Sequence, residues 1–280
     1  MINSGFVVTI LIITNIAFSY KGFTNEVFFN QFKFEVDRIL VNKEYKRFIS
    51  SGFLHVSWMH LLFNMFSLYA FSGLIAAGLG GGSFLIIYFA SLIGGELLSL
   101  LVHRNHPSYS SVGASGAICG IIFASIALYP GLGISFFGLL SIPSWLYGIL
   151  YVGFSIYGIR SNKDNIGHEA HLGGALIGMT LALIMQPAAF AENYLTILLI
   201  AIPGIAFIYL ISTRPQILLV DNYYFKNQKD FYSVDHKYNA EKQNTQDEVD
   251  RILDKISRKG MNSLSRAEKE KLKRYSRKVR

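Results

Sequence analysis

The stretch SVGASGAICG, from Ser111 to Gly120, decides the architecture that we expect for this 280-residue chain. It places Ser115 among glycines at the start of an apolar segment. Gly116, Gly120 and Ala124 then recur every four residues, so they would form one face of a helix. Such a small-residue face lets two membrane helices approach closely. The stretch therefore predicts a helix that packs tightly against a partner, with a serine at its beginning.

The expected partner is the apolar segment over 168–186. It repeats the same small-residue spacing, at Ala170, Gly174 and Gly178. Because one apolar segment separates the two helices, they should run in the same direction, and Ser115 should meet His171 at similar depth. A serine hydroxyl needs a base within hydrogen-bond reach to become a nucleophile. His171 would supply that base.

The composition indicates a polytopic membrane protein, since 51% of the residues are hydrophobic and the mean hydropathy is +0.35. Seven apolar segments follow one another, at about 5–20, 53–77, 83–102, 112–129, 142–160, 168–186 and 194–212. Backbone that crosses lipid must satisfy its own hydrogen bonds, and the alternating strands of a barrel are not seen. We therefore expect an all-α membrane bundle. The first segment is favoured as an uncleaved anchor over a signal peptide, because no basic region precedes it.

Charge is concentrated outside the apolar segments. The segment 21–52 interleaves basic residues with phenylalanines, which suits a position at the level of the lipid headgroups. Its four acidic residues argue against nucleic-acid binding. The tail 214–280 holds 17 of the 26 Lys and Arg and is predicted to be soluble. Possible capping boxes at 245–248 and 265–268 predict a helical hairpin over 245–277, and a solvated appendage without chemistry is the alternative.

Polar side chains at membrane depth are functional candidates, because burying them in lipid is costly. His60 and Asn64 lie four residues apart and share a helical face, whereas His55 lies near the entrance of that helix. They could simply bond neighbouring helices. Together with the backbone N–H of Ser115, they could also stabilise an oxyanion. Glu169 should face away from His171, so we predict a Ser-His dyad and not a triad.

These residues resemble the motifs of the rhomboid intramembrane serine proteases. The matching motifs are His55-x4-His60-x3-Asn64, Gly113-x-Ser115-Gly116 and Ala170-His171-x-x-Gly174. The resemblance covers about residues 1–190 and implies a six-helix core. It implies that Ser115 is the nucleophile and His171 the general base, with His60 and Asn64 as oxyanion donors.

The resemblance further implies that Gly113 shapes the approach to the serine and that Arg47 has a structural role in the first loop. The implied substrates are transmembrane helices of other membrane proteins, cut near their outer ends without metal or cofactor. The expected location is the plasma (inner) membrane of a bacterium, and no oligomeric state is indicated.

Two positions depart from the family's pattern. Many members carry a tyrosine four residues after the serine, packed on the catalytic imidazole, where this chain has Cys119. His171 would then be held less firmly or by another ring. Many members carry a glutamate at the far end of the second helix, where this chain has Ala76. Both positions concern geometry and stability and leave the reaction type unchanged.

The sequence divides into a core at 1–190, a seventh hydrophobic segment at 191–213 and the tail. Seven crossings from a cytoplasmic N-terminus would put the tail outside, whereas the positive-inside rule prefers it inside. Pro203-Gly204 is expected to interrupt the seventh segment, so both a full span and a re-entrant helix stay open. Two other functions are also open. One is an inactive rhomboid-like protein that binds membrane clients, and the other is a small-solute channel with Glu96 on its path.

Overall fold

The computed structural model describes residues 4–136, 140–161 and 166–213, together with scattered positions between 252 and 272. The chain divides into two compact units, residues 1–225 and residues 226–280. The first unit contains the helical bundle, and each unit is described by itself.

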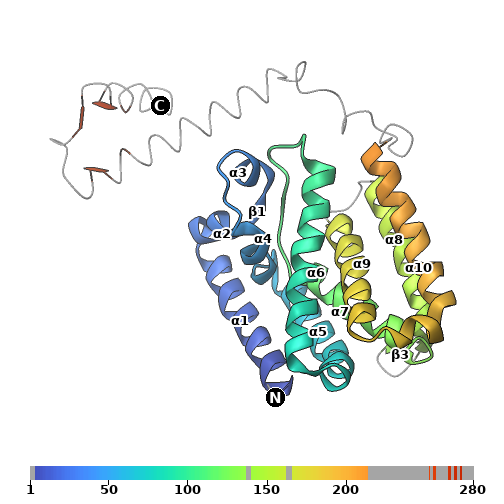
Figure 1. The fold of residues 1–280 in the computed structure, drawn as a ribbon. Coiled ribbons are helices and arrows are strands. Elements are labelled where there is room, and N and C mark those ends of the chain that lie inside the picture. The colour runs from blue at the N-terminus through green and yellow to red at the C-terminus, as the bar shows by residue number, and fades with distance from the viewer. Residues whose placement is uncertain are drawn as a thin grey trace. The chain divides into compact units, whose positions relative to one another are not determined.

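Seven long helices form the bundle (Figure 1). They are α1 (Ser4–Thr24), α5 (Trp58–Gly78), α6 (Gly80–His103), α7 (Ser115–Leu128), α8 (Ser144–Ser161), α9 (His168–Met185) and α10 (Ala188–Thr213). Each overlaps one predicted apolar segment. Among the described residues, α1, α5, α6, α9 and α10 are long and apolar enough to cross a membrane. The shorter α7 is apolar but rises only about 21 Å, less than a hydrocarbon core of about 30 Å.

Short elements connect these helices. Between α1 and α5 lie α2 (Glu26–Phe32), α3 (Val36–Leu40), α4 (Arg47–Ser50) and the 3-10 turn η1 (Ser51–Phe53). Strand β1 (Phe34–Glu35) pairs antiparallel with β2 (Ser110–Ser111), and β3 (Gly133–Phe136) pairs antiparallel with β4 (Leu140–Pro143). The all-α prediction thus describes the bundle but missed these two small ladders.

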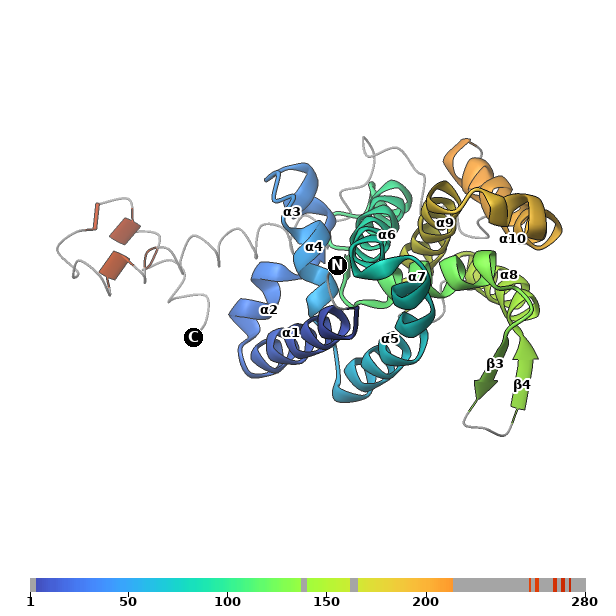
Figure 2. The same cartoon turned by 60° about the horizontal axis from the view of Figure 1, so that its bottom comes forward.

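The bundle has two ends, which Figures 1 and 2 show from two sides. The β1–β2 end holds α2, α3, α4, the β1–β2 ladder, the last turn of α8 and the first turn of α9. The hairpin end holds the α5–α6 turn, the β3–β4 hairpin and the α9–α10 turn. The N-terminus of α1 lies at the hairpin end, and the last residues of α10 lie at the β1–β2 end (Figure 1).

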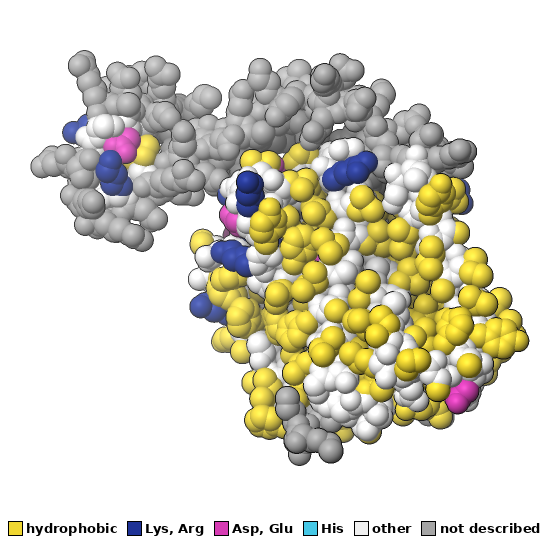
Figure 3. Space-filling model, in the orientation of Figure 1, with side chains coloured by type: hydrophobic (Ala, Val, Ile, Leu, Met, Phe, Trp, Pro, Cys, Tyr) yellow, Lys and Arg dark blue, Asp and Glu magenta, His cyan; other side chains and the backbone are white. Residues whose placement is uncertain are grey.

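The small-residue faces meet as predicted. A Cβ added to Gly174 would strike the backbone oxygen of Gly116, and one added to Gly178 would strike that of Gly120. Because earlier residues of α7 face earlier residues of α9, the two helices are parallel. Helix α6 joins this centre, since a Cβ on Gly95 would strike the oxygen of Ala170. On the outside, large apolar side chains cover the face of the bundle shown in Figure 3.

The backbone of α10 departs from helical geometry at a different residue from the one predicted. The helix continues through Pro203, so the interruption expected at Pro203-Gly204 is wrong. Non-helical backbone occurs instead at Asn193, with φ −121° and ψ 16°. The Asn193 amide donates to the carbonyl oxygens of Ala127 (3.0 Å) and Leu128 (3.3 Å), which lie at the end of α7. The bend thus supplies donors to carbonyls that lack helical partners.

In the tail, the capping box predicted at 265–268 is confirmed. The Ser265 hydroxyl accepts from the backbone N–H of Glu268 (3.3 Å), and the Glu268 carboxylate accepts from the backbone N–H of Ser265 (2.6 Å). Lys255 also donates to this carboxylate (2.8 Å), and these bonds lower the pKa of Glu268 to about 2. The box predicted at 245–248 lies outside the described residues.

Candidate active site

Ser115 and His171 are in direct contact. Ser115 is the first residue of α7, and its Oγ lies 2.6 Å from Nε2 of His171 on α9. This distance fits a hydroxyl that donates to a neutral imidazole. The contact follows from the packing of α7 on α9, because Ser115 adjoins Gly116 and His171 adjoins Ala170. A Cβ on Gly116 would lie only 3.2 Å from the oxygen of Ala170, so the two backbones leave no room for a larger residue.

Gly113 brings the backbone close to His60. Its φ of +134° lies in the region that side chains rarely adopt, and its N–H donates to the Ser51 oxygen at 3.1 Å. A Cβ at this position would lie 2.9 Å from Cε1 and 3.0 Å from Nε2 of His60, and 3.7 Å from the Ser115 Oγ. A glycine is therefore required for the His60 ring to lie beside the serine.

His60 and Asn64 lie on α5, whose first turn is capped by Ser57 accepting from the His60 N–H at 3.2 Å. The Asn64 amide nitrogen donates to the His60 carbonyl at 2.9 Å, and an amide nitrogen carries a second hydrogen. His60 Nδ1 has no hydrogen-bond partner among the residues that the structure describes. Both side chains line the same cavity as Ser115 and His171.

That cavity has a volume of about 900 Å³. Lys33, Tyr109 and Ser110 line it at the β1–β2 end, and Ile122 of α7 lines it deeper in the bundle. The serine therefore lies at the start of a short helix, below the end of the bundle, in a large cavity that apolar and polar side chains line together. Water, which a hydrolysis would consume, has a route to the dyad.

Comparison with known proteins agrees with this geometry. A sequence model of the rhomboid domain matches residues 42–188, a range that includes His55, His60, Asn64, Ser115 and His171. The chain belongs to the rhomboid family. It is thereby a multi-pass membrane protein, as its apolar helices indicate. A second model, a family of unknown function (DUF6576), matches residues 232–278 in the tail.

Several named rhomboid proteins are similar to this chain. RHOMBOID-like protein 12, mitochondrial, of Arabidopsis thaliana is 29% identical over 56% of the chain and 51% of its own length. Rhomboid protease GluP of Bacillus subtilis is 28% identical over 67% of the chain and 36% of its own length. Putative rhomboid protease YdcA of Bacillus subtilis is 37% identical over 29% of the chain. The chain spans about half or less of the length of these relatives.

In this rhomboid, a ring from another helix lies where the tyrosine of the pattern is missing. Cys119 is buried, and its Sγ lies 2.9 Å from the hydroxyl of Tyr151 on α8. The Tyr151 ring centroid lies 6.3 Å from that of His171. Sequence reasoning did not name Tyr151, although the mismatch at Cys119 left two alternatives, a less firmly held His171 or support from another ring. Ala76, the other departure, is buried in α5.

The nearby carboxylates are engaged elsewhere. Glu169 contacts Nε2 of His103 at 3.0 Å, and the His103 ring stacks on Tyr109 with centroids 3.5 Å apart. This agrees with the prediction that Glu169 faces away from His171. Glu96 accepts from the hydroxyls of Ser51 (3.1 Å) and Ser111 (3.2 Å). Glu96 also lines the active-site cavity, and its oxygens join α6 to the two segments beside the site.

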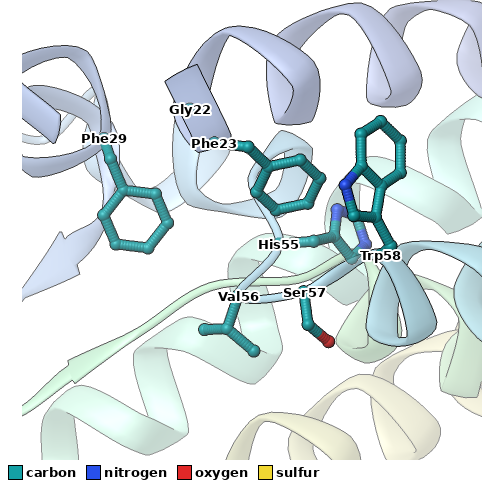
Figure 4. A pocket seen from close by; sticks show the side chains of 7 residues that line it. All are labelled: Gly22, Phe23, Phe29, His55, Val56, Ser57 and Trp58. Carbon is teal, nitrogen blue, oxygen red and sulfur yellow. The ribbon is translucent and has the colours of Figure 1, made fainter. Parts of the chain in front are cut away.

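His55 and Arg47 lie outside the dyad and support its surroundings. His55 Nδ1 lies 2.9 Å from the Ser19 hydroxyl, its ring packs edge-on against His60 at 4.9 Å, and burial lowers its pKa to about 3. Figure 4 shows His55 with Phe23 and Trp58 in a small pocket, whose volume is about 450 Å³.

The buried Arg47 donates to the carbonyls of Asn30 (3.0 Å) and Lys33 (2.6 Å) and to the Glu44 carboxylate (2.7 Å). These contacts tie α4 to α2, as a structural role requires.

Proposed function

We propose that this rhomboid is an intramembrane serine endopeptidase that hydrolyses peptide bonds of transmembrane segments through the Ser115–His171 dyad. The observation that carries the proposal is the 2.6 Å contact between Ser115 Oγ and His171 Nε2, inside a cavity that His60 and Asn64 also line. The proposed protease core is residues 1–190, followed by an additional hydrophobic segment in 191–213 and a basic tail in 214–280.

In the first step, Ser115 Oγ attacks the carbonyl carbon of the scissile bond while its proton passes to Nε2 of His171. Negative charge then develops on the carbonyl oxygen. The Asn64 amide, a His60 N–H and the backbone N–H of Ser115 are the available donors for that charge. The backbone donor is provided by helix geometry, because the first N–H groups of a helix have no partner within it.

In the second step, the His171 imidazolium gives its proton to the leaving amine and an acyl-serine remains. A water molecule that enters through the cavity then attacks the acyl carbon, with His171 as its base. Ser115 leaves with its proton restored. No cofactor or metal is assigned to any step.

The proposed substrates are transmembrane helices that contain small or helix-breaking residues. A peptide carbonyl within a regular helix is bonded to an N–H four residues later, so the segment must unwind before Ser115 can reach it. We also propose a location in the plasma membrane of a bacterium, which the two Bacillus subtilis relatives support. The printed names of plant relatives place those proteins in mitochondria or chloroplasts.

The test compares cleavage of a purified transmembrane test substrate by the wild type, Ser115→Ala and His171→Ala. We expect each variant to lose activity by at least about 10³-fold, because the two groups act as one unit. Ser125→Ala is the matched control, since Ser125 is a buried serine of the same helix whose hydroxyl donates to the Ile121 carbonyl. Cleavage that survives Ser115→Ala would contradict the dyad.

The alternative is a catalytically inactive rhomboid-like protein that binds membrane clients. It predicts no cleavage of any test substrate and no labelling of Ser115 by a serine-directed phosphonate. Labelling that is lost in Ser115→Ala but kept in Ser125→Ala would exclude it.

A further inference from the structure

The β3–β4 hairpin joins α7 to α8, and its sequence carries no charge. No Asp, Glu, Lys, Arg or His occurs in residues 107–159. The stretch 129–143 holds only three polar side chains, those of Tyr129, Ser135 and Ser141. A connection that lies in water normally carries more polar and charged residues than this. The composition therefore indicates that the hairpin has an apolar neighbour.

The register of the ladder separates apolar positions from small ones. Ile134 lies opposite Ile142, and Phe136 pairs with Leu140. Because successive positions of a strand point to opposite faces, the apolar positions 134, 136, 140 and 142 share one face. The other face is formed by the small residues at positions 133, 135, 141 and 143, which are Gly, Ser, Ser and Pro.

The surroundings of the strands agree with this division. A Cβ added to Gly133 would strike the Oγ of Ser141, so these two residues share a face. Ser141 and Pro143 are exposed, whereas Ile134 and Ile142 are half-buried. The apolar face is therefore the more covered of the two.

The hairpin runs across the long helices. In Figure 2, β3 and β4 extend away from the bundle beside α8, and in Figure 1 the same strands are foreshortened at the hairpin end. Helices that cross a membrane run close to the membrane normal. A segment that runs across them at the end of the bundle lies along the membrane surface.

Two free-energy costs limit the depth at which the hairpin can lie in a membrane. The ladder has two strands, and no third strand pairs with it in the described part of the chain, so outward-pointing N–H and C=O groups line both edges. Such groups are costly in hydrocarbon, where nothing bonds them. The apolar face is unfavourable in water. The boundary between hydrocarbon and water avoids both costs.

We propose that the β3–β4 hairpin is an anchor in the membrane interface. It lies flat at the level of the lipid headgroups, with its apolar face on the acyl chains and its small face toward water. Trp145, directly after the hairpin, is 40% exposed, and tryptophan is enriched at this level of a membrane. The exposed apolar side chains of α8, such as Leu150 and Phe154, continue the same surface. The partner of the hairpin is thus the bilayer that surrounds the bundle.

The base of the hairpin is fixed to the residues after α7 and to the start of α8. The Ser144 hydroxyl donates to the carbonyls of Tyr129 (3.2 Å) and Pro130 (2.9 Å), and the Ser144 N–H donates to the Leu132 carbonyl (2.9 Å). Helix α8 begins at Ser144, directly after β4, so no linker separates the anchor from the helix. Two tyrosines near the start of α8 line the active-site cavity. The depth of the hairpin therefore sets the position of one wall of that cavity.

The orientation is tested with the full chain in lipid nanodiscs. Ser141→Cys and Ile142→Cys are adjacent positions on opposite faces, and each carries a small fluorophore attached through a maleimide. We expect lipids with a doxyl group near the top of the acyl chain to quench the label at position 142, and aqueous iodide to quench the label at position 141. The unsubstituted chain, whose Cys119 is buried, gives the background, and Leu150→Cys on α8 gives the lipid reference. Equal iodide quenching at both positions, or no lipid quenching at position 142, would overturn the proposal.

A second copy of the chain is the competing partner, because it could add its own strands to the open edges. Lipid quenching at position 142 that persists in nanodiscs with one copy each supports the anchor. Cross-linking between copies through Ser141→Cys in liposomes, without lipid quenching at position 142, would replace the anchor by an interface between copies.

The apolar face is tested by adding a charge to each face in turn. With the fluorophore at Ile134→Cys, we expect Ile142→Asp to reduce lipid quenching at least about twofold, because a carboxylate is disfavoured among acyl chains. Ser141→Asp, one residue away on the face toward water, is the matched control and should leave the quenching unchanged. The uncharged Ile142→Ser should act in the same direction, which keeps the test valid if the aspartate prevents folding. Unchanged quenching in both Ile142 variants would contradict the assignment of the faces.

The effect on α8 rests on the proposed function. In bilayers we expect Ile142→Asp to lower the cleavage rate several-fold and Ser141→Asp to leave it unchanged. In detergent micelles, which have no planar interface, the two variants should cleave alike. Equal rates in bilayers would overturn the link between the anchor and α8. Failure of the proposed function is distinguishable, because it abolishes cleavage in every variant and leaves the quenching pattern intact.

Discussion

In the centre of the bundle, α6, α7 and α9 approach one another backbone to backbone, whereas the glycines of the flanking helices α5 and α8 face side chains or open space. A Cβ on Gly174 or Gly178 would strike a carbonyl oxygen of α7. By contrast, a Cβ on Gly73 of α5 or Gly153 of α8 would meet nothing within 4 Å. The flanks instead expose large apolar side chains such as Phe63 and Phe154.

The groups that take part in the proposed reaction are divided between the centre and a flank. The nucleophile and the base lie on the tightly packed pair α7 and α9, so their 2.6 Å contact is set by backbone packing. Two of the three oxyanion donors lie on α5, a flank. A change in the centre should therefore disrupt the dyad and the fold together, whereas a change in a flank should affect one catalytic step.

The largest effect is expected for Gly174→Leu. Its side chain would have to displace the backbone of α7, which is rigid, so we expect a loss of about 3 kcal/mol or more in the free energy of unfolding and no detectable cleavage. Gly153→Leu adds the same side chain to an exposed helix position and should leave stability within about 0.5 kcal/mol of the wild type or raise it. Unfolding in mixed micelles and cleavage of the test substrate measure both.

Equal effects of Gly174→Leu and Gly153→Leu would contradict this prediction. They would show that the centre tolerates an added side chain as well as the flank does. Gly174→Ala gives an intermediate point. Its single methyl group already meets the Gly116 oxygen, so it should be destabilising as well.

The next effect is expected for Asn64→Ala on the flank. Removing one oxyanion donor lowers kcat by about 10²–10³-fold when the donor acts in the transition state. KM and stability should change little, since only one bond to the His60 carbonyl is lost. Ser67→Ala, on the same helix and in the wall of the same cavity, is the matched control. A fall in stability without a specific fall in kcat would assign Asn64 to packing alone.

The sequence predicts the centre better than the flanks, and the reason is physical. Small residues at every fourth position can be recognised in the sequence alone. The pairing of Gly116 with Ala170 then predicts which residues of α7 and α9 meet. The start of α5 was placed five residues too early, because Phe53, Leu54 and Val56 are apolar like a helix. In the structure Ser57 caps the helix, and the preceding residues form a 3-10 turn and a loop.

Other features depend on long-range geometry that no local pattern encodes. The β3–β4 hairpin lies in an apolar stretch that a membrane helix could equally have used. The His103–Glu169 contact joins residues 66 positions apart. Ser115 and His171 are also far apart in the sequence. Their contact could nevertheless be predicted, because the glycines beside them fix how α7 packs on α9.

The smallest effect is expected where a flank touches the centre, at Tyr151 of α8. The Tyr151 hydroxyl bonds Cys119 of α7, and its ring lies beside His171 of α9. Tyr151→Phe keeps the ring and removes the bond, as does Cys119→Ala from the other side, so each should cost about 1 kcal/mol of stability. The double variant should cost less than the sum of the two, because they remove the same bond.

Tyr151→Leu separates the ring from the hydroxyl. If the ring positions His171, this variant lowers kcat several-fold further than Tyr151→Phe with KM unchanged, and the pH profile of kcat shifts because it reports the base in the complex. Tyr147→Leu, one turn earlier on α8, lines the same cavity and is the control for lost packing. If Tyr147→Leu and Tyr151→Leu lower kcat equally, α8 acts only as a wall of the cavity. If Tyr151→Leu alone shifts the pH profile, the base depends on a ring that a flank supplies, and the division between centre and flank holds for the nucleophile but not for its base.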